Sequence, residues 1–422
     1  MKKSLLALAA MTAFAGAAQA QSSVTVYGLI DANFSGTHTT LNNSNGGATY
    51  QNGQKQTTTA GFGNSGDSGS RLGFKGSEDL GGGTQAMFTY EVYMYPQDQS
   101  LSGDSKAGST TAGYGLYNRQ SFVGLHKNGV GAATLGLQYT PIFNAQAVTD
   151  PGADNNIVGN VVFSTGPGTD TNGADTVSAF TQRTANTLFL KSDSFAGFTG
   201  SAMYTQNNSN TTQTGTAAAP VGGNTNASGW GLGADYTWHK LYVTGAYQAL
   251  KQLTTASNIG TPAYGSTSTP WTSPQPGAAV GNAGAAASAV GINVQDNQGY
   301  IGATYDFGIL KAYAQYVTRK ATSTQSPNYY VKRSAEQIGV RSFITPAVEA
   351  WASAGLGRYQ AFGASQPTAN FNAWQLGSNY YLSKRTNLYA IYGQQLFSTA
   401  ATATATASAS VQGYAVGVRH TF

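Results

Sequence analysis

From residue 24 onward, apolar and polar side chains alternate in segments of about ten residues, which is typical of membrane-crossing β-strands. An alternating strand presents one apolar face and one polar face, so each segment suits a wall between lipid and water. We predict sixteen strands, at residues 24–34, 70–77, 85–94, 116–126, 132–140, 182–192, 199–206, 229–238, 241–250, 299–306, 310–320, 334–343, 348–358, 371–382, 386–395 and 411–422.

The connections between these segments alternate between short turns and long polar stretches. An even number of antiparallel strands with this alternation places all short turns on one side of a membrane and all long loops on the other. The low-complexity tracts at 208–226, 262–288 and 399–410 fall in long connections, where they need no core of their own. The pattern therefore predicts an all-β fold, a single closed antiparallel transmembrane barrel.

The alternation also assigns the two faces of each strand. In the third predicted strand, one face carries Ala86, Phe88, Tyr90 and Val92, and we expect it to meet lipid. The opposite face includes Glu91 and should line a water-filled lumen. In the last strand, the outward face ends with the terminal residue, Phe422.

Composition supports this interpretation and excludes several other classes. Charged residues make up 9% of the chain, against roughly 25% in ordinary soluble domains, while glycine and tyrosine number 54 and 25. No window beyond the N-terminus is continuously apolar for about 18 residues, which argues against membrane-spanning helices. The chain has no cysteine, and its net charge of +5 is too mild and too scattered to indicate a nucleic-acid partner.

The N-terminus has the features of an export signal. Lys2 and Lys3 precede an apolar stretch that ends in a small-residue motif at 18–20, and that stretch is shorter than the roughly 20 residues a membrane span needs. We therefore expect residues 1–20 to be a signal peptide and residues 21–422 to form the barrel. Loss of the two lysines lowers the formal charge from +5 to +3.

Three segments resemble the Gram-negative general-diffusion porins, and most of all their β-proteobacterial, Burkholderia- and Neisseria-like branch. They are SRLGFKGSEDLGGG at 70–83, YNRQSFVGL at 117–125 and VRHTF at 418–422. The resemblance covers the whole mature chain. It implies a homotrimer of sixteen-stranded barrels in the outer membrane, with the third loop folded into the lumen as a constriction. It also implies passive diffusion of small hydrophilic solutes, contact with membrane lipid and lipopolysaccharide, and recognition of Phe422 by the assembly machinery.

Three arginines are candidates for that constriction. Arg71, Arg119 and Arg183 lie in the second, fourth and sixth predicted strands, and by alternation we expect each to point inward. Each stands roughly 7 to 10 residues before the next short turn, so at about 3.3 Å per residue all three should reach mid-barrel height. They match the arginine cluster of the family's eyelet. Ordinary lumen charges in a wet pore are the plainer interpretation, but three aligned arginines favour a basic stripe.

The opposing acidic groups are expected on the third loop, which begins at Pro141. Asp150 and Asp154 are four residues apart, so one helical turn would place both on one face. Their spacing matches the acidic pair of the family's loop. Pro151 and Gly152 weaken such a turn, and the rest of the family's loop motif is absent, so plain solvation of the two carboxylates is an equally good interpretation.

Two other function classes compete with a diffusion pore. A barrel enzyme needs a nucleophile beside a general base, but the four histidines fall at turns, at the chain end or in the first long loop. A substrate-specific channel for phosphate or an organic acid is compatible with a basic stripe, but such a channel needs more closely spaced positive side chains along its path. No phosphate loop, dinucleotide fingerprint or histidine metal motif is present, so we expect no cofactor. The sequence favours a weakly anion-selective pore.

Overall fold

The computed structural model describes residues 23–43, 54–96, 117–163, 179–216, 219–254, 294–324, 330–362, 369–401 and 406–422. The expected signal peptide and the 262–288 tract lie outside these residues. The elements are β1 (Ser23–Asn43), β2 (Gln54–Asn64), β3 (Arg71–Gly81), β4 (Thr84–Tyr93), β5 (Asn118–Lys127), β6 (Gly131–Tyr139), α2 (Pro141–Thr149), β7 (Arg183–Ser192), β8 (Phe198–Thr216), β9 (Ala219–Trp238), β10 (Leu241–Thr254), β11 (Val294–Asp306), β12 (Lys311–Ser323), β13 (Tyr330–Thr345), β14 (Val348–Phe362), β15 (Ala369–Tyr381), β16 (Thr386–Ala401) and β17 (Thr406–Thr421).

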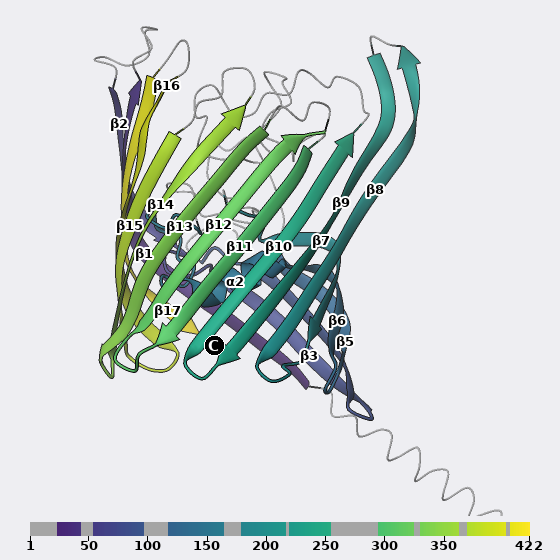
Figure 1. The fold of residues 1–422 in the computed structure, drawn as a ribbon. Coiled ribbons are helices and arrows are strands. Elements are labelled where there is room, and N and C mark those ends of the chain that lie inside the picture. Colours follow the sequence, from purple (N-terminus) through teal and green to yellow (C-terminus); the bar gives the residue numbers. More distant parts are fainter. Residues whose placement is uncertain are drawn as a thin grey trace, which may run out of the picture.

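These strands form one closed antiparallel barrel, in which β1 pairs with β17 to complete the ring (Figure 1). The seventeen strand segments occupy sixteen positions, because β1 pairs with β2 along its upper part and with β3 along its lower part. The predicted sixteen-stranded barrel is thereby confirmed. None of the helices that the structure describes is long and apolar enough to cross a membrane.

The second barrel position is interrupted between β2 and β3. The predicted long polar segment after residue 34 instead contains the end of β1 and all of β2. At the break, the Asp31 carboxylate accepts hydrogen bonds from the backbone N–H groups of Asp67 and Ser68, both at 2.8 Å. A buried carboxylate that collects two backbone donors holds this short inner segment in a fixed place.

The 208–226 tract corrects the sequence interpretation. A loop is predicted there, but β8 and β9 continue through it as a paired ribbon up to Thr216 and Ala219. This ribbon rises above the neighbouring strands (Figure 1). The prediction of a loop at 399–410 is wrong in the same way, because β16 continues to Ala401 and β17 begins at Thr406. Beyond the membrane both faces of a strand meet water, so apolar alternation no longer marks it even though the backbone pairing continues.

The predicted faces agree with the exposure of the side chains. Phe88 and Tyr90 on β4 are exposed on the outer wall, whereas Glu91 is buried on the inner side. Val92 is the exception, since it is 4% exposed at a register shift between β4 and β5. Such a bulge changes the direction in which neighbouring side chains point.

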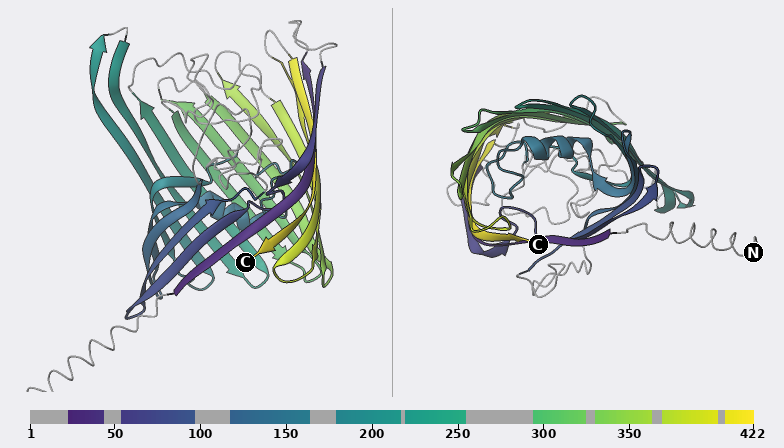
Figure 2. Two further views of the ribbon diagram at one scale, coloured as in Figure 1. Left: turned by 180° about the vertical axis from the view of Figure 1, so that it is seen from behind. Right: turned by 90° about the horizontal axis from the view of Figure 1, so that it is seen from below.

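The third long connection begins with α2, which lies inside the ring of strands (Figure 2). Thr140 caps the helix by accepting from the Phe143 N–H, and its hydroxyl donates to the Thr181 carbonyl at 2.8 Å, which joins the two ends of the loop. The segment that follows α2 lies against the inner wall. A side chain at Gly393 would place its Cβ 1.8 Å from the Val158 carbonyl oxygen, so glycine is required there for this close approach.

Candidate functional site: a charged constriction

The three predicted arginines lie on alternate strands, and tyrosines from the strands between them contact the guanidinium groups of Arg119 and Arg183. The Arg119 guanidinium is 4.4 Å from the ring centroid of Tyr93, and that of Arg183 is 5.5 Å from the same ring. Arg183 also lies 5.8 Å from the ring of Tyr139. Cations attract the faces of aromatic rings, so the tyrosines offset part of the repulsion between Arg119 and Arg183.

Arg119 points inward for a reason that alternation alone does not give. Strict alternation groups it with Val123 and Leu125, which are exposed on the outer wall. The pairing of β4 with β5 moves from Gln120 directly to Asn118, which makes Arg119 the extra residue of a bulge. The bulge turns its side chain into the barrel, where it is 8% exposed.

Glu91 is the acidic partner of this cluster, and the sequence placed it on the correct face without assigning it a role. Its carboxylate accepts from Arg119 Nε at 2.7 Å and lies 3.8 Å from Arg71 Nε. Arg119 also donates to the Tyr139 hydroxyl at 2.8 Å. One carboxylate therefore neutralises part of the positive charge of two arginines.

The three arginines differ in their access to water. The Arg71 side chain is 27% exposed, whereas that of Arg119 is 10% exposed. Arg183 is 1% exposed and donates to the Tyr93 hydroxyl at 3.2 Å. Arg71 is therefore the member of the trio that faces the lumen most openly.

Asp150 and Asp154 come together without the helical turn that their spacing suggested. The helix α2 ends at Thr149, and Ala153 and Asp154 adopt positive φ angles of 54° and 58°. The Asp150 carboxylate accepts from the Asp154 N–H at 2.8 Å and from Asn160 at 2.8 Å. Asp150 thus shapes the loop, while Asp154 faces the lumen beside the arginines.

Both carboxylates are held in unfavourable surroundings for a negative charge. Burial raises the pKa of Asp150, although the hydrogen bonds that it accepts work in the opposite direction. Burial and the nearby charge of Asp150 raise the pKa of Asp154 well above its ordinary value.

A row of inward-facing glutamines fixes the loop to the wall. Gln375 accepts from the Asn155 side chain at 3.1 Å and donates to the Val158 carbonyl at 3.0 Å. Gln337 accepts from the Val161 N–H at 3.0 Å and donates to Asp150 at 3.2 Å. Glutamines at 248, 298 and 315 hold other backbone groups of the loop in the same way.

The loop also reaches the inner segment between β2 and β3. Asn156 donates its side-chain amide to the Ser65 carbonyl at 2.7 Å and its backbone N–H to the Gly66 carbonyl at 3.0 Å. Two segments that are 91 residues apart in the sequence are therefore bonded to each other inside the barrel.

A cavity of about 540 Å³ lies at this level. Its lining includes Arg71, Arg119, Glu91 and Asp154, together with aromatic side chains such as Tyr93. Opposed positive and negative groups across a narrow aqueous passage create a transverse field, which orients polar solutes and biases ions by charge.

Two further buried arginines were not singled out from the sequence. Arg319 pairs with Asp296 at 2.9 Å, and Arg333, directly across the strand pair from Arg319, donates to the Val161 carbonyl of the loop. Alternation along β12 and β13 places both inward, which is the signal that could have found them. Among the described residues, no cluster of three or more histidine, aspartate or glutamate side chains could hold a metal ion.

Comparison with known proteins gives consistent matches. A family model described as Gram-negative porin matches residues 7–400. An outer membrane porin protein of Bordetella pertussis is 28% identical over the full length of both chains. Outer membrane porin protein 32 of Delftia acidovorans is 38% identical over 33% of each chain.

Solved structures share the fold. The anion-selective porin from Comamonas acidovorans aligns with a TM-score of 0.60 and 24% identity, covering 95% of this chain and all of that one. The trimer form of OmpT from Vibrio cholerae aligns with a TM-score of 0.55 and 14% identity, covering 95% and 99% of the two chains.

Proposed function

The chain belongs to the Gram-negative porin family and forms an outer-membrane channel for the diffusion of small hydrophilic solutes, and we propose that this channel is weakly anion-selective. The observation that supports the proposal is the charge balance at the constriction. Arg71, Arg119 and Arg183 stand there against the carboxylates of Glu91 and Asp154, which leaves one net positive charge. Asp150 is not counted, because it is buried within the loop and does not line the cavity. The structural neighbour from Comamonas acidovorans carries the description anion-selective, which agrees with this balance.

The proposal includes three features of the assembly. The functional unit is a homotrimer, as in the trimer form of the OmpT neighbour. Residues 1–20 are removed on export, and Phe422 is read by the outer-membrane assembly machinery. The upper outer wall contacts lipopolysaccharide.

Reversal potentials in planar bilayers test the selectivity. Replacing Arg71, Arg119 and Arg183 together by Ser should move the reversal potential in a KCl gradient toward cations, because it removes the positive excess. The single variant Arg71→Ser should give a shift of the same sign, and it leaves the two most buried arginines in place.

A matched control removes the same charge away from the constriction. Lys127, Lys191 and Lys311 lie at strand ends near the short turns, so their triple replacement by Ser should leave the reversal potential near that of the wild type. Selectivity set at the constriction is refuted if the control moves the potential as much as the arginine variants do.

A further inference from the structure

The constriction cavity of about 540 Å³ is lined by aromatic side chains as well as by charged ones. Tyr27 and Tyr139 come from the barrel wall, and Phe143 and Phe163 come from the third loop. Tyr27, Tyr139 and Phe143 are half-buried, so each shows part of its ring to the cavity. The volume lies within the range of roughly 300 to 1,000 Å³ that is usual for small-molecule sites.

Phe143 on α2 joins two of the other rings into a continuous apolar surface. Its ring centroid is 4.4 Å from that of Tyr139 and 6.3 Å from that of Phe163. Within the part of the chain that the structure describes, the cations that lie over aromatic rings contact tyrosines or Phe371, not these two phenylalanines. The ring of Phe143 therefore faces the passage without serving the arginine cluster.

Arg71 is the cation best placed to receive an anion beside these rings. Its side chain is 27% exposed, and its Nε lies 3.8 Å from the Glu91 carboxylate, which is too long for a hydrogen bond. Among the described residues, its one hydrogen bond runs from Nη1 to the Gly69 carbonyl at 3.3 Å. A guanidinium has five N–H donors in a planar fork that matches a carboxylate. Arg71 therefore keeps donors for the carboxylate of a solute.

Tyr27 places a further ring directly beside Arg71 on the wall. It pairs with Gly73 across β1 and β3, and a Cβ at Gly73 would lie 2.3 Å from the tyrosine ring, so the ring rests on the glycine backbone. Gly73 stands between Arg71 and Lys75 on the inward face of β3, and the Lys75 ammonium lies 5.2 Å from the centroid of the Tyr27 ring. The wall thus presents a cation, a ring and a second cation in succession toward the short turn.

We infer that, among the small anions that the channel passes, the constriction prefers aromatic carboxylates. The inference rests on the anion selectivity proposed above and names the class of solute. The transverse field turns the carboxylate of the solute toward Arg71 and away from Asp154 on the loop. The planar ring of the solute then lies against Phe143, and it passes Tyr27 on the way to the short turns. Contacts of this strength hold the solute only briefly, as passage through a channel requires.

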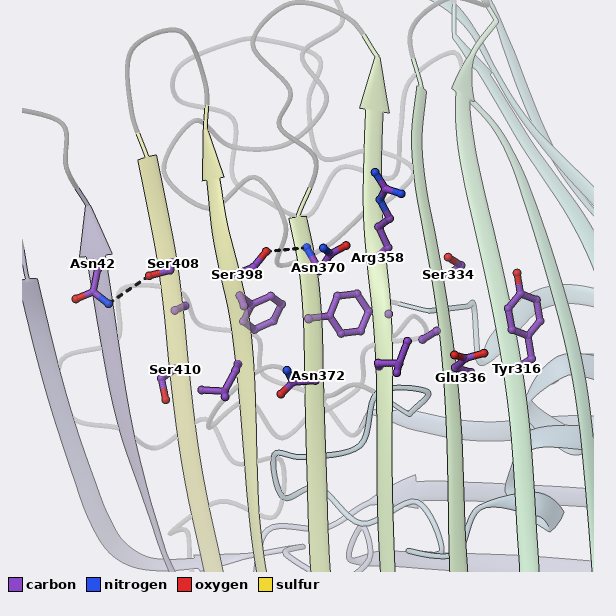
Figure 3. Close-up of a pocket in the computed structure, with 17 residues that line it drawn as sticks. Asn42, Tyr316, Ser334, Glu336, Arg358, Asn370, Asn372, Ser398, Ser408 and Ser410 are labelled. Carbon is purple, nitrogen blue, oxygen red and sulfur yellow. Dashed lines mark hydrogen bonds between the residues drawn. The ribbon is translucent and has the colours of Figure 1, made fainter.

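A hollow of about 780 Å³ on the outside of the barrel does not compete for such a solute. It lies across β12 to β17 and the end of β1 (Figure 3). Its lining residues Tyr316 and Leu356 are 41% and 56% exposed, whereas Arg319 on the same strand as Tyr316 is fully buried and points inward. This hollow faces away from the passage, so Tyr316 provides an aromatic control.

The test compares two carboxylates of equal charge and similar size in single-channel recordings. Benzoate carries an aromatic ring, whereas cyclohexanecarboxylate carries a saturated ring of six carbons. A pair of aromatic rings gains about two- to tenfold in affinity beyond the effect of the area that it buries. Benzoate should therefore halve the chloride current of the wild-type channel at a concentration at least about threefold lower than cyclohexanecarboxylate does.

Four variants assign the effect to residues. Phe143→Leu removes the ring and keeps an apolar side chain, so it should bring the two half-blocking concentrations together. Tyr27→Leu changes the wall and leaves the loop as it is, and it should also lower the preference. Arg71→Ser should raise the half-blocking concentrations of both acids by a similar factor, because it removes the partner of the carboxylate. Tyr316→Leu removes a ring from the outer wall and should keep the wild-type preference.

Equal half-blocking concentrations of the two acids in the wild type would overturn the inference. A wild-type preference in both Phe143→Leu and Tyr27→Leu would overturn it too, as would an equal loss in Tyr316→Leu. Single-channel conductance in KCl reports that each variant has assembled. The reversal potential in KCl is measured separately: cation preference there would refute the proposed anion selectivity, whereas anion preference without discrimination between the two acids would refute only the class of solute.

Discussion

Replacing Glu91 is the most direct test of how the charges at the constriction set the selectivity of the pore. It bonds Arg119 at 2.7 Å and lies 3.8 Å from Arg71, so it is the main carboxylate that offsets the basic wall. In the Glu91→Gln variant, the net charge of the constriction rises from +1 to +2. Glutamine retains an oxygen that can accept from Arg119 Nε, so the arginine keeps its hydrogen bond and its position.

The size of the effect follows from Coulomb's law in a wet pore. One unit charge acting on an ion about 6 Å away contributes about 0.7 kcal/mol at the dielectric constant of water. Screening with a Debye length of about 10 Å at 0.1 M salt reduces this to about 0.4 kcal/mol. The concentration of anions then rises about twofold and that of cations falls about twofold, so the permeability ratio shifts about fourfold toward anions.

The assay compares permeability ratios from reversal potentials in KCl gradients at low and high salt. Glu349→Gln is the matched control, because Glu349 also pairs with an inward arginine, Arg341, at 2.6 Å. It is the second residue of β14, close to a short turn, and it does not line the cavity that Arg71 and Glu91 share. An unchanged ratio in Glu91→Gln, or an equal change in the control, would refute the reasoning.

Two further predictions follow from the loop carboxylates and from the chain end. The raised pKa of Asp154 means that it takes up a proton at a pH above the ordinary carboxyl value of about 3.9, so anion preference should grow as the pH falls through this raised pKa. Because the folded state then binds more protons than the unfolded state, this group also stabilises the fold as the pH falls. Asp154→Asn should remove most of this pH dependence in reversal-potential titrations, and a titration like that of the wild type would contradict the assignment. At the chain end, the Phe422 backbone exchanges two hydrogen bonds with Gly28, so Phe422→Ala keeps the barrel seam while it removes the ring. Reduced amounts of heat-modifiable trimer on detergent gels are expected for this variant, with Phe343→Ala, another exposed aromatic near a short turn, at wild-type level.

The barrel could be predicted from the sequence because each membrane-crossing strand shows its own alternation of apolar and polar residues. Alternation of apolar and polar residues places Phe88 outward and Glu91 inward without reference to any other strand. The same local pattern fails beyond the membrane, where β8 and β9 pair with water on both faces. It also fails at Arg119, since a bulge is decided by the pairing of two strands and leaves no mark in one of them.

The path of the third loop is a long-range property. Its anchors include Gln375, which bonds Asn155 across 220 residues of sequence, and Gln337, which bonds Val161 across 176. An inward glutamine looks like any other lumen residue until its partner is known. The four-residue spacing of Asp150 and Asp154 suggested the correct neighbours, but positive φ angles at 153 and 154 replace the helical turn.

The three arginines of the cluster look equivalent in the sequence, but their surroundings in the structure differ. Arg183 is buried against Tyr93 and beside the foot of the loop, and Arg119 is bonded to Glu91 and Tyr139. Charges that are already compensated at short range contribute less to the field felt by a passing ion. Arg71 is more exposed and lies 3.8 Å from Glu91, and Asp154 lines the same cavity from the loop. These two groups are therefore expected to act most directly on a passing ion. A pore built in this way is only weakly selective, because a change of a single charge is enough to cancel or to double the net charge of +1.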